Sequence, residues 1–153
     1  MTNSLLVPII RIRNRTPLPC YMTASAAGMD VYADLSDSAD EKDTLMILPL
    51  SRALIPTGFA LTVPDGYEAQ IRPRSGLAFR AGLTILNSPG TIDADYRDEV
   101  KILVINLGEQ PVQITHGDRI AQLVVAPVTR VAWQEVEQLT STSRTGGFGH
   151  TGQ

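Results

Sequence analysis

Apolar and polar residues alternate along much of this chain, in short runs that turn residues interrupt. The clearest run, YEAQIR at residues 67–72, places Tyr67, Ala69 and Ile71 on one side of an extended chain and polar residues on the other. Further runs with strand character are 7–13, 59–63, 83–86, 99–107 and 119–128. Many short strands, without helical stretches of about ten residues between them, predict a mainly β fold such as a sandwich, barrel or jelly roll.

One short helix is expected within residues 73–82, PRSGLAFRAG. Ser75 is a candidate N-cap, Leu77 and Ala81 recur at helical spacing, and Gly82 is a typical stop. The helix would be alone in an otherwise β chain.

The end of the chain has a different composition from the rest. After Trp133 the apolar content falls, and residues 137–153, EQLTSTSRTGGFGHTGQ, have four glycines and no periodicity. We therefore expect one β domain over residues 1–137 and a flexible Gly-rich arm over residues 138–153.

Composition narrows the classes of partner. The chain has 153 residues, 43% of them hydrophobic, and thirteen basic against sixteen acidic residues give a net charge of −3. No bulk positive field would draw it to nucleic acid or anionic lipid, and no run approaches the ~18 apolar residues of a membrane span. Its one cysteine, Cys20, cannot form an internal disulfide. With no targeting signal, we expect a cytoplasmic protein that binds neither nucleic acid nor membrane.

Four groups of residues could carry chemistry, and each has a plain structural alternative. Asp30, after Gly28, could simply cap a turn, and residues 117–122 form a good turn and strand. Outside these four groups, the acidic stretch at residues 34–44 lacks the glycine and final glutamate of a calcium loop, so we expect a solvated surface loop there. At residues 74–77, free amides at a helix start beside Arg74 could cradle a phosphate or merely begin a helix.

The remaining group is NSPGTIDADYRDEV at residues 87–100, which should be the hairpin or loop between two strands. Asp93 and Asp95 would lie on one side if the backbone stays extended. Such acids are costly to bury unless they bind a cation, a water or a donor. Tyr96 adds a flat wall with a polar tip, which suits a sugar or a base.

Five stretches contain these groups in a particular order: AGMDVYA (27–33), PRSGLA (73–78), NSPGTIDADYRDE (87–99), GDRIAQ (117–122) and RTGGFGHTG (144–152). Together they resemble the five motifs of the trimeric dUTPase family, and the resemblance spans nearly the whole chain. It implies a distorted jelly roll or barrel and a homotrimer with active sites at subunit boundaries. It also implies Mg²⁺-assisted hydrolysis of dUTP to dUMP and pyrophosphate, which supplies dUMP for thymidylate synthesis and keeps uracil out of DNA.

The same resemblance assigns roles to individual residues. Asp93 would orient or deprotonate the water that attacks the α-phosphorus, and Asp30 would hold Mg²⁺ through water. The nucleoside would meet Asn87, Gly90, Thr91, Ile92, Tyr96 and Phe148. The phosphates would meet Arg74, Ser75, Gly76, Gln122, Arg144, Gly149, His150 and Thr151.

Three positions depart from the family pattern. Asp98 stands where glycine is common, Arg144 is one residue nearer Phe148 than usual, and His150 occupies a position often held by serine. Two rival functions differ in class. A dCTP deaminase shares the fold but has another hairpin pattern, and a nucleotide-sensing module would not need Asp93 or a complete arm.

Overall fold

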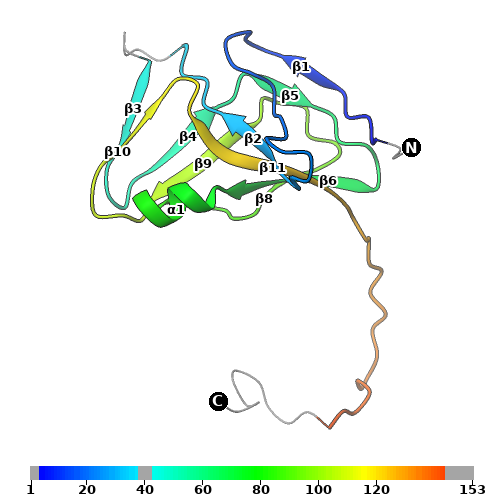
Figure 1. The fold of residues 1–153 in the computed structure, drawn as a ribbon. Coiled ribbons are helices and arrows are strands. Elements are labelled where there is room, and N and C mark those ends of the chain that lie inside the picture. The colour runs from blue at the N-terminus through cyan, green and yellow to red at the C-terminus, as the bar shows by residue number, and fades with distance from the viewer. Residues whose placement is uncertain (1–3, 38–42, 144–153) are drawn as a thin grey trace.

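The computed structural model describes residues 4–37 and 43–143 of the chain (Figure 1). These residues form mostly short strands and one short helix. The strands are β1 (Ile9–Arg11), β2 (Met29–Tyr32), β3 (Thr44–Ile47), β4 (Arg52–Pro56), β5 (Phe59–Leu61), β6 (Tyr67–Pro73), β7 (Leu83–Ile85), β8 (Gly90–Ile92), β9 (Lys101–Asn106), β10 (Val112–Thr115) and β11 (Arg119–Pro127), and the helix is α1 (Ser75–Ala81). The mainly β, jelly-roll-like fold predicted from the sequence is confirmed.

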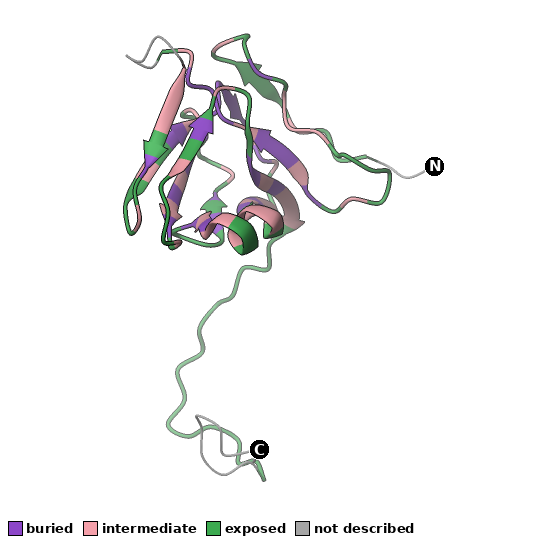
Figure 2. Ribbon diagram, turned by 60° about the vertical axis from the view of Figure 1, so that its left-hand side comes forward, coloured by how far each residue is buried: buried purple, intermediate pink, exposed green. Residues whose placement is uncertain are grey.

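Two sheets enclose the core. The larger has the strand order β2-β11-β6-β8 and the smaller β4-β9-β7, while β1 pairs with β5 and β10 with β3. All of these pairings are antiparallel. Leu123 of β11 and Ile102 of β9 belong to one buried cluster, so the inner faces of both sheets share a core (Figure 2). Burying one such side chain stabilises the fold by roughly 1.5–3 kcal/mol.

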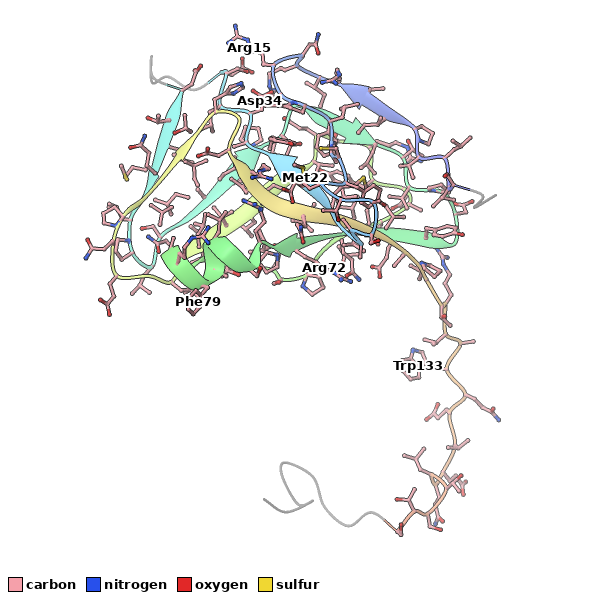
Figure 3. The ribbon with its side chains drawn as sticks, in the orientation of Figure 1. Arg15, Met22, Asp34, Arg72, Phe79 and Trp133 are labelled. Carbon is pink, nitrogen blue, oxygen red and sulfur yellow. The ribbon has the colours of Figure 1, made fainter. Side chains whose placement is uncertain are left out.

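Strand β6 behaves as its alternation predicts. Ala69 and Ile71 are 0% and 4% exposed, whereas Arg72, which follows Ile71, is exposed. Figure 3 shows Arg72 on the outer side of the sheet. The core side of β6 is therefore set by its period of two residues.

Helix α1 lies where the sequence predicts it, but its first residue differs from the prediction. Ser75 is already helical, and the N-cap position belongs to Arg74, whose backbone is extended and whose side chain makes no cap bond. The N-cap role expected for Ser75 is therefore wrong. The helix ends at Gly82 as expected, with φ 68°. A Cβ at Gly82 would overlap the backbone nitrogen of Gly108, so the left-handed turn and the close approach both favour glycine.

The segment from residue 87 to 99 is more than a loop between two strands. Strands β7 and β9 are paired, as the expected hairpin requires. Between them, however, β8 leaves their sheet and pairs with β6 of the larger sheet, with Gly90 opposite Ile71 and Ile92 opposite Ala69. The connection therefore crosses from one sheet to the other.

The acidic stretch that begins at Asp34 is not wholly solvated, so that expectation is wrong at its first residue. Asp34 is 1% exposed and accepts a hydrogen bond from Arg13, whereas Asp37 is exposed. Residues 38–42 of the stretch lie outside the described residues. The burial of Asp34 depends on Arg13, 21 positions earlier, a partner that local composition does not reveal.

Beyond β11 the described chain runs away from the sheets without forming a helix or strand (Figure 1). Trp133 is 94% exposed and Leu139 88% exposed on this stretch of residues 128–143 (Figure 3). The predicted division at residue 137 stays a prediction. Among the described residues, no helix has both the length and the apolar character that a membrane span requires.

Candidate active site

A buried carboxylate at Asp30 gathers several donors, and we call Asp30, Arg74, Arg119 and Gln122 the Asp30 corner. Asp30 is 2% exposed in β2, directly opposite Gln122 of β11. Gln122 Nε2 donates to Asp30 Oδ1 and Arg119 Nη1 to Oδ2, both at 3.1 Å. Arg74 Nη2 lies 3.8 Å from Oδ2. The structure thus brings together three predicted residues and adds Arg119, to which sequence reasoning gave no role.

The start of α1 adjoins this corner. Arg74 Nη1 donates to the Arg119 carbonyl at 2.8 Å, which holds the guanidinium beside β11. The first helical bonds come from the amides of Leu77 and Ala78 to the Arg74 carbonyl, so the Ser75 and Gly76 amides precede them. A Cβ at Gly76 would lie 3.1 Å from Arg80 Nη2, and this second guanidinium therefore folds back over the helix start. Arginine side chains and free backbone amides that lie together at the start of α1 can bind an anion.

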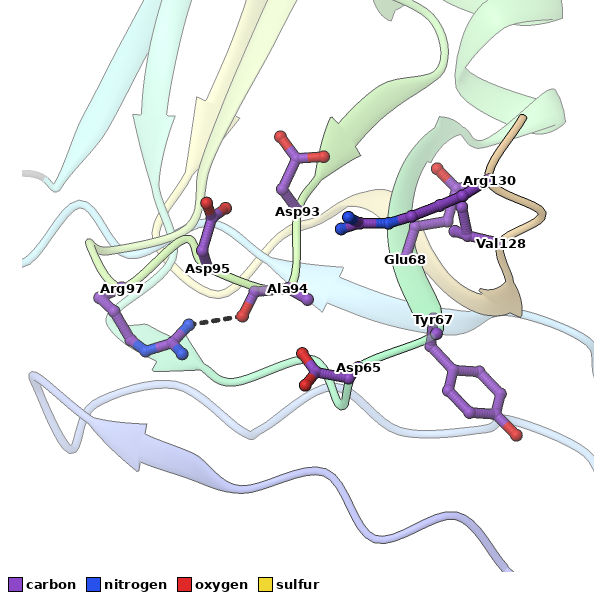
Figure 4. Close-up of a pocket in the computed structure, with 10 residues that line it drawn as sticks. Asp65, Tyr67, Glu68, Asp93, Ala94, Asp95, Arg97, Val128 and Arg130 are labelled. Carbon is purple, nitrogen blue, oxygen red and sulfur yellow. Dashed lines mark hydrogen bonds between the residues drawn. The ribbon is translucent and has the colours of Figure 1, made fainter. Parts of the chain in front are cut away.

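Asp93 lies in a different surface depression, which we call the Asp93 hollow. It has a volume of about 820 Å³ (Figure 4). Its charged lining residues are Asp65, Glu68, Asp93, Asp95, Arg97 and Arg130. Asp93 is exposed, and within the described residues no hydrogen bond or ion pair joins its carboxylate to another side chain. An exposed carboxylate without a partner can orient or deprotonate a water molecule.

The backbone turns directly after Asp93 instead of staying extended. The Tyr96 amide donates to the Asp93 carbonyl at 3.2 Å, across a turn at residues 94–95. Asp93 and Asp95 still project from the same side of the loop (Figure 4). Arg97 Nη1 donates to the carbonyls of Ala94 and Tyr96 at 2.7 and 2.8 Å, which stabilises the turn.

Tyr96 is held at its polar tip. Its hydroxyl donates to the Glu99 carbonyl at 2.8 Å, and the residue is 37% exposed. Burial, followed by the negative charges of Asp98 and Glu99, raises the pKa of Tyr96 above its ordinary value. The hydroxyl therefore remains a neutral donor at neutral pH.

The residues predicted to contact uracil differ in their exposure. Thr91 is exposed, whereas Ile92 is 7% exposed and belongs to the core, so only its backbone could meet a ligand. The side chain of Asn87 packs close to Gly90. A Cβ added at Gly90 would lie 3.2 Å from Asn87 Nδ2. The peptide bond between Ser88 and Pro89 is cis.

The described chain does not bring all predicted residues into one cavity. The lining of the Asp93 hollow includes neither Tyr96 nor any member of the Asp30 corner. Five predicted residues lie outside the described residues: Arg144, Phe148, Gly149, His150 and Thr151.

No ready-made protein site for a metal is present in the described part of the chain, where no group of three or more His, Cys, Asp or Glu side chains could hold an ion. Asp30 is surrounded by cationic and amide donors, which disfavours direct metal ligation. A carboxylate can accept about four hydrogen bonds, so Asp30 keeps capacity for water.

A jelly-roll-like β domain with an arginine-rich corner and an exposed carboxylate is suited to phosphate hydrolysis. A family model described as dUTPase matches residues 14–152, and the chain belongs to the dUTPase family. The resemblance inferred from the five motifs is thereby confirmed.

Individual proteins agree with this assignment. The deoxyuridine 5'-triphosphate nucleotidohydrolase of Wolbachia sp. subsp. Brugia malayi (strain TRS) is 55% identical over 140 residues, which cover 90% of this chain and 86% of that protein. The Staphylococcus bacteriophage 80alpha dUTPase with dUPNHPP superposes with a TM-score of 0.82 at 26% identity, over 99% of each chain. A mutant phage phi11 dUTPase from S. aureus, described with a structural Mg(II) ion, has a TM-score of 0.76 at 23% identity, over 90% of this chain and all of that one.

Proposed function

We propose that this protein is a dUTP diphosphatase, which hydrolyses dUTP to dUMP and pyrophosphate. The observation that carries the proposal concerns Asp93, in a chain of the dUTPase family. Asp93 is exposed, has no side-chain partner among the described residues, and lies on the loop that also holds Tyr96. Such an activity would supply dUMP for thymidylate synthesis and keep uracil out of DNA.

Asp93 is the proposed general base. It accepts a proton from a water whose oxygen bonds to the α-phosphorus, while the bond from that phosphorus to the α,β-bridging oxygen breaks and pyrophosphate leaves. A positioned base contributes about 10²–10⁴-fold to such a rate. The exposure of Asp93 supports this role, because a carboxylate already paired with an arginine would be a weaker base.

The phosphates are proposed to bind at Arg74, Ser75, Gly76 and Gln122, together with Arg144, Gly149, His150 and Thr151 of the arm. A triphosphate carries about four negative charges, so cationic donors must offset the repulsion that an incoming water meets. Asp30 supports this binding by orienting Arg74 and Gln122 through its own contacts.

The nucleoside is proposed to bind along the same loop as Asp93. The Tyr96 ring would lie against the deoxyribose and leave no room for a 2′-hydroxyl, with Phe148 over the uracil. Asn87 and the backbone of Gly90, Thr91 and Ile92 would meet the uracil edge. A soft pocket discriminates one methyl by only ~1–3 kcal/mol, so a tight backbone is better suited to exclude thymine.

Magnesium is proposed to arrive as part of the substrate, chelated by the triphosphate. Asp30 would contact the ion only through water. This agrees with the capacity of the Asp30 carboxylate for further hydrogen bonds and with the donors from Arg119 and Gln122 that already surround it. The phi11 phage dUTPase, described with a structural Mg(II) ion, shares this fold.

A homotrimer with shared active sites is the proposed assembly. Its first support is that the Asp93 hollow and the Asp30 corner have no lining residue in common. Its second is the exposure of large apolar side chains at Leu6, Ile10 and Trp133, which are 84%, 63% and 94% exposed. A neighbouring copy would cover such surfaces.

The test of the activity is product analysis after incubation with dUTP, dCTP, dTTP and UTP in parallel, with magnesium and with a chelator. We expect magnesium-dependent dUMP and pyrophosphate from dUTP alone. Ammonia from dCTP would move the chain to the deaminase branch, and no product from any of the four would favour a nucleotide-binding module.

The role of the arm has its own test. Deleting residues 140–153 should leave the melting temperature unchanged and collapse turnover of dUTP. Full activity in the truncated protein would remove Arg144, Phe148, Gly149, His150 and Thr151 from the proposed site.

A further inference from the structure

A charge cluster outside the proposed site joins distant parts of the chain. We call Arg13, Asp34, Asp37 and Glu99 the Arg13 cluster. Arg13 Nε donates to Asp34 Oδ2 at 2.9 Å, Nη1 lies 3.4 Å from Asp37 Oδ2, and Nη2 donates to Glu99 Oε1. The side chains of Arg13, Asp34 and Glu99 are 20%, 0% and 14% exposed. The guanidinium is thus a half-buried bridge from the segments that follow β1 and β2 to Glu99, at the end of the loop that carries Asp93.

The charges in this cluster are well satisfied. Burial alone would raise the pKa of Asp34, but hydrogen bonds from Ser36 and Arg13 to its two oxygens hold it below its ordinary value. Burial likewise opposes the charge of Arg13, and the Asp34 and Glu99 carboxylates outweigh it and raise the pKa of Arg13. An arginine with three carboxylate neighbours holds them in a set geometry, which a flexible ammonium would not do.

The main chain at Gly58 fits the same cluster. Its amide donates to Glu99 Oε1 at 2.8 Å, and its carbonyl accepts from the amides of Ile12 and Arg13 at 2.8 and 3.1 Å. Gly58 has φ 77°, and a Cβ there would overlap Asp34 Oδ2. The Glu99 carboxylate is therefore held from two sides, by a side chain and by a backbone turn.

Glu99 connects the Arg13 cluster to Tyr96 through its backbone carbonyl. Its carbonyl accepts the Tyr96 hydroxyl at 2.8 Å. The next residue, Val100, donates its amide to the Phe59 carbonyl at 3.0 Å, and its carbonyl accepts from Thr57 Oγ1 at 2.6 Å. The acceptor that holds the tip of Tyr96 is thus part of a backbone segment fastened by Arg13 and by residues 57–59.

We propose that Arg13 is a positioning residue that sets the selectivity for deoxyribose, because it holds Glu99 and thereby the ring of Tyr96. This inference rests on the role proposed above for Tyr96. Arg13 itself touches no substrate. If the Glu99 side chain is released, the Tyr96 acceptor can shift, and a ring that shifts no longer excludes a 2′-hydroxyl.

The test compares Arg13→Gln with Arg11→Gln in the full chain. Arg11 is a matched control because it lies two residues earlier, at the end of β1, and donates at 2.7 Å to the Thr16 carbonyl, away from Glu99. The measurement is the ratio of kcat/KM for dUTP to kcat/KM for UTP, with the melting temperature recorded in parallel. We expect Arg13→Gln to lower the ratio by roughly 10-fold or more, the scale of one lost steric contact, and Arg11→Gln to leave it unchanged.

A double-mutant cycle identifies the route of the effect. If Arg13 acts through Tyr96, then Arg13→Gln should change the ratio much less in a Tyr96→Phe background, which already lacks the hydroxyl. Arg13→Lys should restore part of the ratio, because it keeps the charge but not the forked geometry.

Several outcomes decide the matter. A lower melting temperature with an unchanged ratio in Arg13→Gln would mean that Arg13 is only structural and would overturn the inference. Equal loss of the ratio in both backgrounds would overturn the route through Tyr96. If Arg13→Gln does not fold, Arg13→Lys and Glu99→Gln carry the same comparison with the same criteria. An unmutated protein that does not hydrolyse dUTP overturns the proposed function itself, whereas a selective parent with selective variants overturns only the role of Arg13.

Discussion

The loop from Asp93 to Glu99 carries a carboxylate at each end, and the two ends differ in almost every physical respect. Asp93 is exposed in a hollow, with no bonded side chain among the described residues. The Glu99 side chain is 14% exposed and is held by Arg13 and by the Gly58 amide. The loop therefore has one end that is available for chemistry and one end that is anchored. Changes at the first end should affect rate, and changes at the second should affect stability and geometry.

The largest effect is expected for Asp93→Asn. We expect kcat for dUTP to fall by about 10²–10⁴-fold, because the amide cannot accept the proton of the attacking water. The melting temperature should stay within about a degree of the parent, since an exposed side chain without a partner contributes little stability. Steady-state kinetics and a thermal melt measure the two quantities. Parent-like turnover in Asp93→Asn would exclude Asp93 as the base.

The next largest effect is expected for the stability of Gly58→Ala, because the Gly58 amide holds Glu99 at the anchored end of the loop. We expect a loss of roughly 1–2 kcal/mol for the left-handed backbone and about 1–3 kcal/mol more for the overlap with Asp34. Urea unfolding measures the total free energy of unfolding.

Gly117→Ala is the matched control for this prediction. Gly117 has φ 83°, similar to 77° at Gly58, but a Cβ there meets nothing within 4 Å. It should show the backbone cost alone. Equal losses in the two variants would mean that the contact with Asp34 costs nothing.

A smaller effect should appear on the acid side of the stability curve. The pKa of Asp34 is lower in the folded protein than its ordinary value, so folded Asp34 binds a proton less readily than unfolded Asp34. Its contribution is complete above the unfolded pKa of about 3.9 and is lost as the pH falls through the folded pKa. Urea midpoints at a series of acidic pH values should therefore fall less steeply in Asp34→Asn than in the parent. Parallel curves would show that Asp34 is not responsible.

The smallest effect is expected for Asp98→Gly, within the loop between the two ends. Among the described residues, the non-glycine positions with positive φ are Asp43 and Leu50, so Asp98 adopts a backbone that needs no glycine. We expect a stability loss below about 1 kcal/mol from the added freedom of the unfolded chain. The pKa of Tyr96 should fall, because one carboxylate that raises it is gone. A tyrosine titration by ultraviolet absorbance follows this shift, and a gain in stability would contradict the backbone argument.

The elements that the sequence predicts well are those set by local pattern. The alternation in β6 gives its buried face, and Gly82 marks the end of α1. The contacts that it misses depend on register between distant strands. Pairing of β2 with β11 places Arg119 and Gln122 at Asp30, and the approach of Arg13 buries Asp34. The crossing of β8 to the other sheet is equally non-local.

The sequence singles out residues for the candidate site but does not give their arrangement in space. The ordered motifs single out Asp30, Arg74 and Gln122, which the fold brings together. They also single out Asp93, which stands in a separate hollow. Nothing in the local sequence around Arg13 connects it to Glu99, because 86 positions separate the two residues.

The contact between Gly82 and Gly108 restricts the freedom of this chain to vary. A Cβ at Gly82 would overlap the Gly108 backbone, and a Cβ at Gly108 would lie 2.5 Å from the Ala81 carbonyl oxygen. Each clash is with main chain, so no substitution at the opposite position can relieve it. In a saturation library both sites should therefore reject every other residue, and they should do so independently, without pairs of changes that rescue one another. The approach of α1 to the turn after β9 is a point at which the domain can be altered only by moving its backbone.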